Sequence, residues 1–248
     1  MRPFVILCLL ILAASSMMAR AQQMLPPEYN PLVYERLDVV VRALPNGSAL
    51  VEFTAALKNE GKVVVVPGYG MIPLTVSQRE TFLGLPLPSE RTSNGSINIL
   101  GAKNLDTGRK IEALVINRNG TRAIRYSLWQ PLKPGDVERI RLVFRVDGAI
   151  AQGVLFNEMD LSLGPLSNTV KEGTLRVIPP LGQRITFSDP PSEGGSWDIS
   201  GTGPRGSFKI SVEFSQIPLP LMPFHGYFVI WGGVILLILV LILVRLRR

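Results

Sequence analysis

The stretch "DVERIRLVFRV", residues 136–146, alternates apolar with charged or polar side chains. Successive side chains of a β-strand point to opposite faces, so this alternation predicts a strand with one buried face and one solvated face. The apolar positions are Ile140, Leu142, Phe144 and Val146, and the opposite positions include Arg139, Arg141 and Arg145.

The same kind of pattern extends in both directions from this stretch. "RLDVVVRA" (residues 36–43) and "GSFKISVEF" (residues 206–214) are rich in β-branched and aromatic residues, and Gly or Pro interrupts the chain every few residues. No sustained helical periodicity occurs between the two ends of the chain. Short strands separated by turns are typical of sandwich folds, so we predict an all-β, immunoglobulin-like β-sandwich.

A possible internal repeat indicates two tandem modules. "NGSALVEFT" (46–54) and "NGTRAIRYS" (119–127) align without a gap, which places one module at residues 22–102 and a second at 103–216. The alternative is one continuous sandwich, because Asn-Gly followed by alternating residues is a general hairpin signal.

The chain ends in a long apolar stretch, residues 224–244, followed by a tail at 245–248. A bilayer core needs about 20 apolar residues in a helix, so we predict one transmembrane helix at 224–244. Interfacial aromatic residues and cytoplasmic arginines would mark its two ends. These residues are Tyr227 and Trp231 at one end, and Arg245, Arg247 and Arg248 at the other. A buried core helix is the alternative.

The first residues, 1–21, have the layout of a secretory signal peptide, with a basic start, an apolar run and small residues before the expected cleavage site after Ala21. An uncleaved N-terminal anchor is the alternative. "IPLPLMP" (217–223) predicts a stiff, extended stalk before the transmembrane helix. We therefore expect a single-pass protein of the cell membrane, with an extracellular body and a short cytoplasmic C-terminus.

The C-terminal arrangement resembles prokaryotic surface-sorting tails, in which a short segment, an apolar span and basic residues follow one another. The family-specific LPxTG, PEP and PGF motifs do not occur before the span. This departure favours a retained anchor over a processed tail. Cys8 lies in the signal peptide, and an exported body without disulfides points to a prokaryotic source.

The predicted body has neither cysteine nor histidine, because Cys8 and His225 are the chain's single examples. Without them, Ser-His-Asp and Cys-His catalysis and ordinary zinc, copper or haem sites are excluded. We expect a protein that is not an enzyme and holds no cofactor or metal. Glu158 and Asp160, two residues apart, remain the alternative as a catalytic carboxylate pair.

The formal charge of +7 arises mainly at the two ends of the chain, so it does not predict nucleic-acid binding. Basic residues also concentrate in residues 109–145, which predicts a partner-binding basic face. Its residues are Arg118, Arg122, Arg125, Arg139, Arg141 and Arg145. The alternative is an ordinary solvated strand face with cross-strand ion pairs.

Each Asn-Gly pair of the chain is followed by Ser or Thr, which makes Asn46, Asn94 and Asn119 candidate N-glycosylation sites. Asn-Gly is also the preferred pair in two-residue hairpin turns, and this is the alternative.

These observations predict a non-catalytic surface protein that binds another envelope or membrane protein, or itself, or that serves in envelope assembly. The alternative is an accessory subunit of a membrane-bound enzyme or transport complex. No small-molecule substrate is evident.

Overall fold

The computed structural model describes residues 31–82, 85–91, 96–118, 121–153, 156–204, 206–217 and 225–246. The chain from Leu32 onward forms one compact unit. The predicted signal peptide and most of the predicted stalk lie outside the described residues. Strands make up most of the described chain, which confirms the predicted all-β fold.

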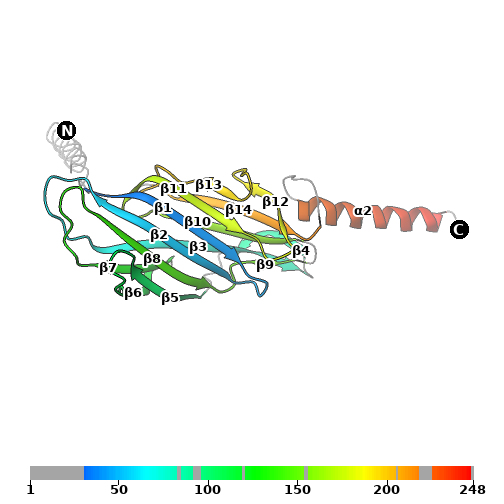
Figure 1. Ribbon diagram of the computed structural model, residues 1–248. Coiled ribbons are helices and arrows are strands. Elements are labelled where there is room, and N and C mark those ends of the chain that lie inside the picture. The colour runs from blue at the N-terminus through cyan, green and yellow to red at the C-terminus, as the bar shows by residue number, and fades with distance from the viewer. Residues whose placement is uncertain are drawn as a thin grey trace, which may run out of the picture. The chain divides into compact units, whose positions relative to one another are not determined.

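The strands of the described chain form two sheets (Figure 1). The six-stranded sheet, in the order β13-β11-β1-β2-β8-β5, contains β1 (Leu32–Ala43), β2 (Ala49–Asn59), β5 (Ile97–Asn104), β8 (Val137–Val146), β11 (Thr169–Ile178) and β13 (Ser196–Asp198). The eight-stranded sheet, in the order β12-β14-β10-β3-β7-β6, contains β3 (Gly68–Phe82), β6 (Ala113–Arg118), β7 (Thr121–Leu128), β10 (Asn157–Leu163), β12 (Arg184–Asp189) and β14 (Phe208–Ser215). Two short strands complete it, β4 (Leu85–Arg91) on β3 and β9 (Ala151–Gln152) on β10.

β8 has the alternation expected from its sequence. Its alternate residues Ile140, Leu142, Phe144 and Val146 are buried. On the other face, Arg139 and Arg145 are exposed and Arg141 is partly exposed. Leu142 and Phe144 lie opposite Phe53 and Val51 of the antiparallel strand β2, so both strands bury the same face. β1 pairs in parallel with β11 on one side and antiparallel with β2 on the other.

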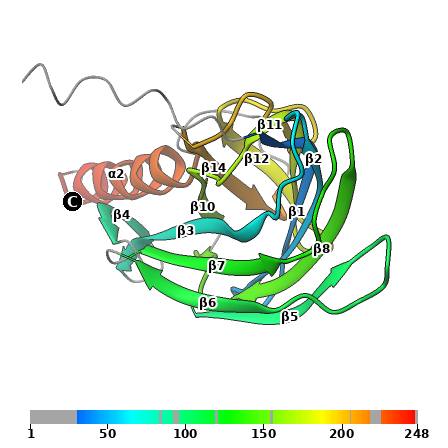
Figure 2. The same cartoon turned by 90° about the vertical axis from the view of Figure 1, so that its left-hand side faces the viewer.

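The core lies between the inner faces of the two sheets (Figure 2). Tyr34 of β1 and Tyr126 of β7 meet there, with their hydroxyl oxygens 2.5 Å apart. Both tyrosines are fully buried. This hydrogen bond satisfies two polar groups in an apolar interior and links one sheet to the other.

The predicted boundary between modules, after residue 102, falls within β5. Strands from both sides of that boundary are neighbours in each sheet. β8 lies between β2 and β5, and β3 lies between β10 and β7. The two predicted stretches therefore contribute to one hydrophobic core.

Beyond the strands, α2 (His225–Leu246) forms a helix of 22 residues, and its side chains are described from Gly232 on. Arg245 lies in its last turn. Within the part of the chain that is described, no helix has both the length and the apolar character needed to span a membrane. The side chains of Tyr227 and Trp231, and all of Arg247 and Arg248, lie outside the described residues.

Candidate partner-binding surface

The arginines of β8 are engaged with carboxylates. The pairs are Arg139 Nη1–Asp106 Oδ1 at 3.2 Å, Arg141 Nε–Glu52 Oε1 at 2.7 Å, and Arg145 Nε–Asp147 Oδ1 at 2.8 Å. All three pairs are partly exposed, where an ion pair contributes little to stability. Pairing nevertheless lowers the positive charge that this face offers to a partner.

The carboxylate of Asp147 forms hydrogen bonds with residues near the ends of several strands. It accepts hydrogen bonds from Ser96 Oγ at 2.8 Å, Asn98 Nδ2 at 2.8 Å and Ser48 Oγ at 3.1 Å. The hydrogen bond from Ser96 is the main cause that lowers the pKa of Asp147. The hydrogen bond from Ser48 and the positive charge of Arg145 lower this pKa further. Asp147 thus ties the beginnings of β2 and β5 to the end of β8.

The six predicted basic residues do not form one face. Arg139, Arg141 and Arg145 belong to the six-stranded sheet, whereas Arg118 ends β6 and Arg122 and Arg125 lie on β7 of the other sheet. The two sheets pack against each other through the core, so their solvated faces point in different directions. The side chain of Arg118 lies outside the described part.

Arg125 instead joins an aromatic cluster. Its guanidinium carbon lies 4.6 Å from the centre of the Tyr69 ring, a cation–π distance. The Tyr69 ring meets Trp129 edge to face, with ring centres 5.1 Å apart. Tyr69 is the second residue of β3 and Trp129 follows the end of β7, and the ladder pairs Tyr69 with Ser127.

Three exposed valines, Val63, Val64 and Val66, lie on the connection between β2 and β3. Val65 and Leu132 exchange main-chain hydrogen bonds, so the segments that carry the valines and Trp129 run antiparallel beside each other. We call the exposed side chains of these segments the aromatic platform. Its members, with their exposed fractions, are Val63 (66%), Val64 (58%), Val66 (49%), Tyr69 (55%) and Trp129 (58%).

The fully buried Asn59 holds the two segments in place. Its Nδ2 donates to the carbonyls of Val63 at 2.8 Å and Leu132 at 2.9 Å, and its Oδ1 accepts from the Gly61 main chain at 2.9 Å. Its own main chain also bonds to Gly135 and Asp136. The valines are therefore exposed in a fixed conformation.

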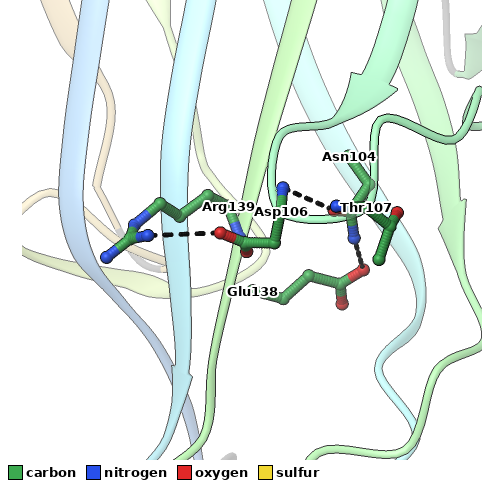
Figure 3. A network of polar contacts seen from close by, with 5 residues as sticks. All are labelled: Asn104, Asp106, Thr107, Glu138 and Arg139. Carbon is green, nitrogen blue, oxygen red and sulfur yellow. Dashed lines mark hydrogen bonds and ion pairs between the residues drawn. The ribbon is translucent and has the colours of Figure 1, made fainter.

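A polar network lies near this end of β8 (Figure 3). Asn104 Nδ2 donates to Glu138 Oε1 at 2.7 Å, and Asn104 Oδ1 accepts from the main chains of Asp106 at 2.9 Å and Thr107 at 2.8 Å. Glu138 is buried, and its Oε2 has no hydrogen-bond partner among the described residues. Burial raises the pKa of Glu138, the bond from Asn104 opposes this, and the charge of Asp106 adds to it.

Asn46 lies apart from the aromatic platform, because it precedes β2 whereas the platform valines follow the other end of that strand. Asn46 is exposed in the turn between β1 and β2, where its Oδ1 accepts from the Ser48 main chain at 3.2 Å and Gly47 has a φ of 81°. This is the turn geometry that Asn-Gly favours. Asn94 and Asn119 lie outside the described residues.

Glu158 and Asp160 lie on β10, opposite Glu213 and Ser211 of β14. Asp160 accepts a hydrogen bond from Ser211 Oγ. Within the described residues no group of three or more His, Cys, Asp or Glu side chains is placed to hold a metal ion.

Sequence reasoning missed the aromatic platform. Its signals are the run "VVVV" at residues 63–66, which does not alternate, and two aromatic residues, Tyr69 and Trp129, close to glycine or proline. Runs of this kind also fill buried strands, so only the exposure of these side chains distinguishes a surface from a core.

The chain matches no known protein-family profile. It is 30% identical over 128 residues to the uncharacterized protein MJ1395 of Methanocaldococcus jannaschii, an alignment that covers 50% of this chain and 89% of that protein. Solved structures share only a distant likeness. The M1 zinc metallopeptidase of Deinococcus radiodurans is 10% identical with a TM-score of 0.37, and yeast LTA4 hydrolase is 10% identical with a TM-score of 0.43. The matches cover 75% and 79% of this chain but 42% and 32% of those proteins.

Proposed function

We propose that this chain, which belongs to the same family as the protein MJ1395 of Methanocaldococcus jannaschii, is a non-catalytic binding protein of the cell surface. Its immunoglobulin-like β-sandwich faces outward from a C-terminal membrane anchor and binds another envelope or membrane protein. The observation that carries the binding role is the aromatic platform.

The argument for binding is energetic. Each exposed valine or aromatic ring keeps apolar area in water, at about 25 cal/mol per Å² that burial would recover. A flexible loop could turn such side chains inward, but the hydrogen bonds of Asn59 hold these segments outward. Contiguous exposed apolar side chains on a fixed scaffold are typical of protein interaction sites.

The proposed anchor rests on the sequence. Residues 224–244 carry no Asp, Glu, Lys or Arg, and α2 spans 22 residues across this stretch. The apolar side chains of its described part are exposed, which would be unfavourable in water and favourable in lipid. The arginines at its end would then lie on the cytoplasmic side.

The absence of His and Cys from residues 22–223 supports a role without catalysis. Glu158 and Asp160 lie beside a strand ladder with polar neighbours, and Asp160 is hydrogen-bonded to Ser211. This environment suits a structural role of these carboxylates.

Co-purification tests the proposal. The full chain is extracted from its own membranes in mild detergent, and its mass and all accompanying proteins are determined. A stoichiometric second protein is the expected result, and a large multispan partner would identify the chain as an accessory subunit. A bare monomer would contradict a binding role, and recovery of the chain in the soluble fraction would contradict the anchor.

A further inference from the structure

We infer that the aromatic platform docks a partner protein whose contact surface is apolar at its centre and acidic at its rim. The docking site lies at the end of the sandwich away from the point where the chain leaves β14. This inference rests on the proposed function and specifies the site and the chemistry of the partner.

The position of the platform follows from the strand register. Asp160 of β10 lies opposite Ser77 of β3 and Ser211 of β14, which places these three residues at one level. Tyr69 precedes this level along β3, whereas Ser215, the last residue of β14, lies beyond it in the other direction. At about 3.3 Å per residue, Tyr69 and Ser215 are separated by about 40 Å along the strands.

This separation bears on what can cover the platform. The chain leaves the β-sandwich after Ser215 and continues to α2. If α2 lies in the membrane, as proposed above, the bilayer adjoins the Ser215 end of the sandwich. The platform then faces away from that bilayer, which favours a protein over the lipid surface as its occupant.

Charge around the platform favours an acidic partner. Three connections meet at this end of the sandwich, residues 60–67, 105–112 and 129–136. Their cationic side chains have no ion pair among the described residues, whereas two of their four carboxylates are already paired. The cations are Lys62, Arg109, Lys110 and Lys133, and the paired carboxylates are Glu60 with Lys171 and Asp106 with Arg139.

With Arg125 of β7 added, this end of the sandwich carries five such cations against the two remaining carboxylates of the connections, Glu112 and Asp136. A second copy would present the same cationic rim if it docked platform to platform. Like charges would then oppose each other, which disfavours that arrangement. An acidic rim on a different protein complements the observed charge.

The composition of the platform agrees with a protein partner. Trp, Tyr and Arg are the residue types that most often dominate binding energy at protein interfaces, and Tyr69 contacts both Trp129 and Arg125. Their fixed arrangement reduces the conformational entropy that binding would otherwise cost.

Site-specific photo-crosslinking in the native membranes tests this inference. The full chain carries benzoylphenylalanine at Trp129, and a matched control carries it at Leu181, a fully exposed residue on the connection between β11 and β12. The expected result is one cross-linked protein from Trp129, identified by mass spectrometry, and none of that protein from Leu181. Cross-links only to lipid, only to a second copy, or to nothing would overturn the inference.

The identified protein is then purified, and its Kd for the full chain and for variants of the chain is measured in detergent. These Kd values test the proposed apolar centre and acidic rim of the partner. Trp129→Ala should raise Kd about 30-fold or more, as expected at an interface hot spot. The double variant Lys62→Glu and Lys133→Glu should raise Kd about tenfold at low salt, and this effect should shrink as salt is added. Leu181→Ala and Arg176→Glu, exposed residues elsewhere, are controls and should leave Kd unchanged.

The two proposals fail in different ways. One outcome is a stoichiometric partner whose Kd is changed by neither Trp129→Ala nor the lysine double variant. That result would overturn the inference and leave the proposed function intact. Full-chain preparations with no protein partner would overturn the proposed function as well.

Discussion

Gly70 shows how one residue sets the packing of the core. A Cβ at this position of β3 would lie 2.2 Å from Cζ and 2.4 Å from the hydroxyl oxygen of Tyr126. Tyr126 is buried and hydrogen-bonded to Tyr34, so its ring cannot swing into solvent. The missing side chain of Gly70 therefore makes room for the bond that links the two sheets.

We expect Gly70→Ala to lower the free energy of unfolding by about 1–3 kcal/mol, as overpacking of a filled core usually does. Gly101→Ala is the matched control, because a Cβ there meets no atom within 4 Å and the position is also in a strand. Its effect should stay within about 1 kcal/mol. Denaturant titration followed by circular dichroism measures both, and equal stabilities of the two variants would contradict the packing argument.

The raised pKa of Glu138 predicts that the stability of the protein depends on pH. Burial raises the pKa of this carboxyl in the folded protein, so the folded state favours the protonated form. The free energy of unfolding should therefore fall as pH rises from the unfolded-state value, about 4.3, through the raised pKa of the folded state. Above that pKa the loss is complete and this contribution no longer changes.

Glu138→Gln should remove this part of the pH dependence, because an amide does not ionise. Denaturant titrations at several pH values between 4 and 8 give the free energy of unfolding of both proteins. The difference between the two curves of free energy against pH measures the contribution of Glu138. Parallel curves across this range would show that the Glu138 carboxyl does not have a raised pKa.

At the scale of elements, loop contacts decide how the strands end. Asn59 organises the connections that follow β2 and precede β8, and Asp147 joins the starts of β2 and β5 to the end of β8. Each is a short polar side chain that hydrogen-bonds to donors or acceptors that the strand ladder does not pair. The first arrangement holds the aromatic platform, and the second holds the opposite ends of the same strands.

Asp147 titrates in the opposite sense to Glu138. Its hydrogen bonds with Ser96 and Ser48 and the charge of Arg145 lower its pKa, so the folded state favours the charged form. This stabilisation is present above the unfolded-state pKa, about 3.9, and is lost as pH falls through the lower folded-state pKa. Asp147→Asn should lower the melting temperature at pH 7 and reduce the further loss on acidification.

Thermal melts at pH 7 and pH 3 measure this effect, with Asp189→Asn, an exposed carboxylate at the end of β12, as the control. A larger effect at Asp189 than at Asp147 would contradict the assigned role of the Asp147 cluster.

At the scale of the whole molecule, the two predicted modules share their sheets. Because β8 lies between β2 and β5, and β3 between β10 and β7, cutting the chain at the predicted boundary would leave each half with unpaired strand edges. We expect residues 22–102 and 103–216, made separately, to show no cooperative thermal unfolding. The full chain should show one cooperative transition of its sandwich. Well-dispersed NMR spectra and a cooperative melt of either half would instead support independent modules.

Local pattern made the all-β fold predictable. Alternation in residues such as Ile140, Leu142 and Phe144 depends on nearest neighbours along the strand, and the structure buries that face. The same reasoning could not assign Arg125 and Arg141 to different sheets, because strand order depends on contacts between residues far apart in the chain. It also could not foresee that Glu52 and Asp147 would pair with the arginines of β8.

The sequence by itself therefore determined the class of fold, through a two-residue period, and the absence of histidine and cysteine from residues 22–223, through composition. Tertiary structure alone decided which charges are paired, which valines remain exposed and which residues meet in the core. The physical reason is the separation along the chain of the residues that set each property. A strand's two faces are set by alternation along the chain, whereas charge pairing, exposure and the Tyr34–Tyr126 contact depend on segments that only folding brings together.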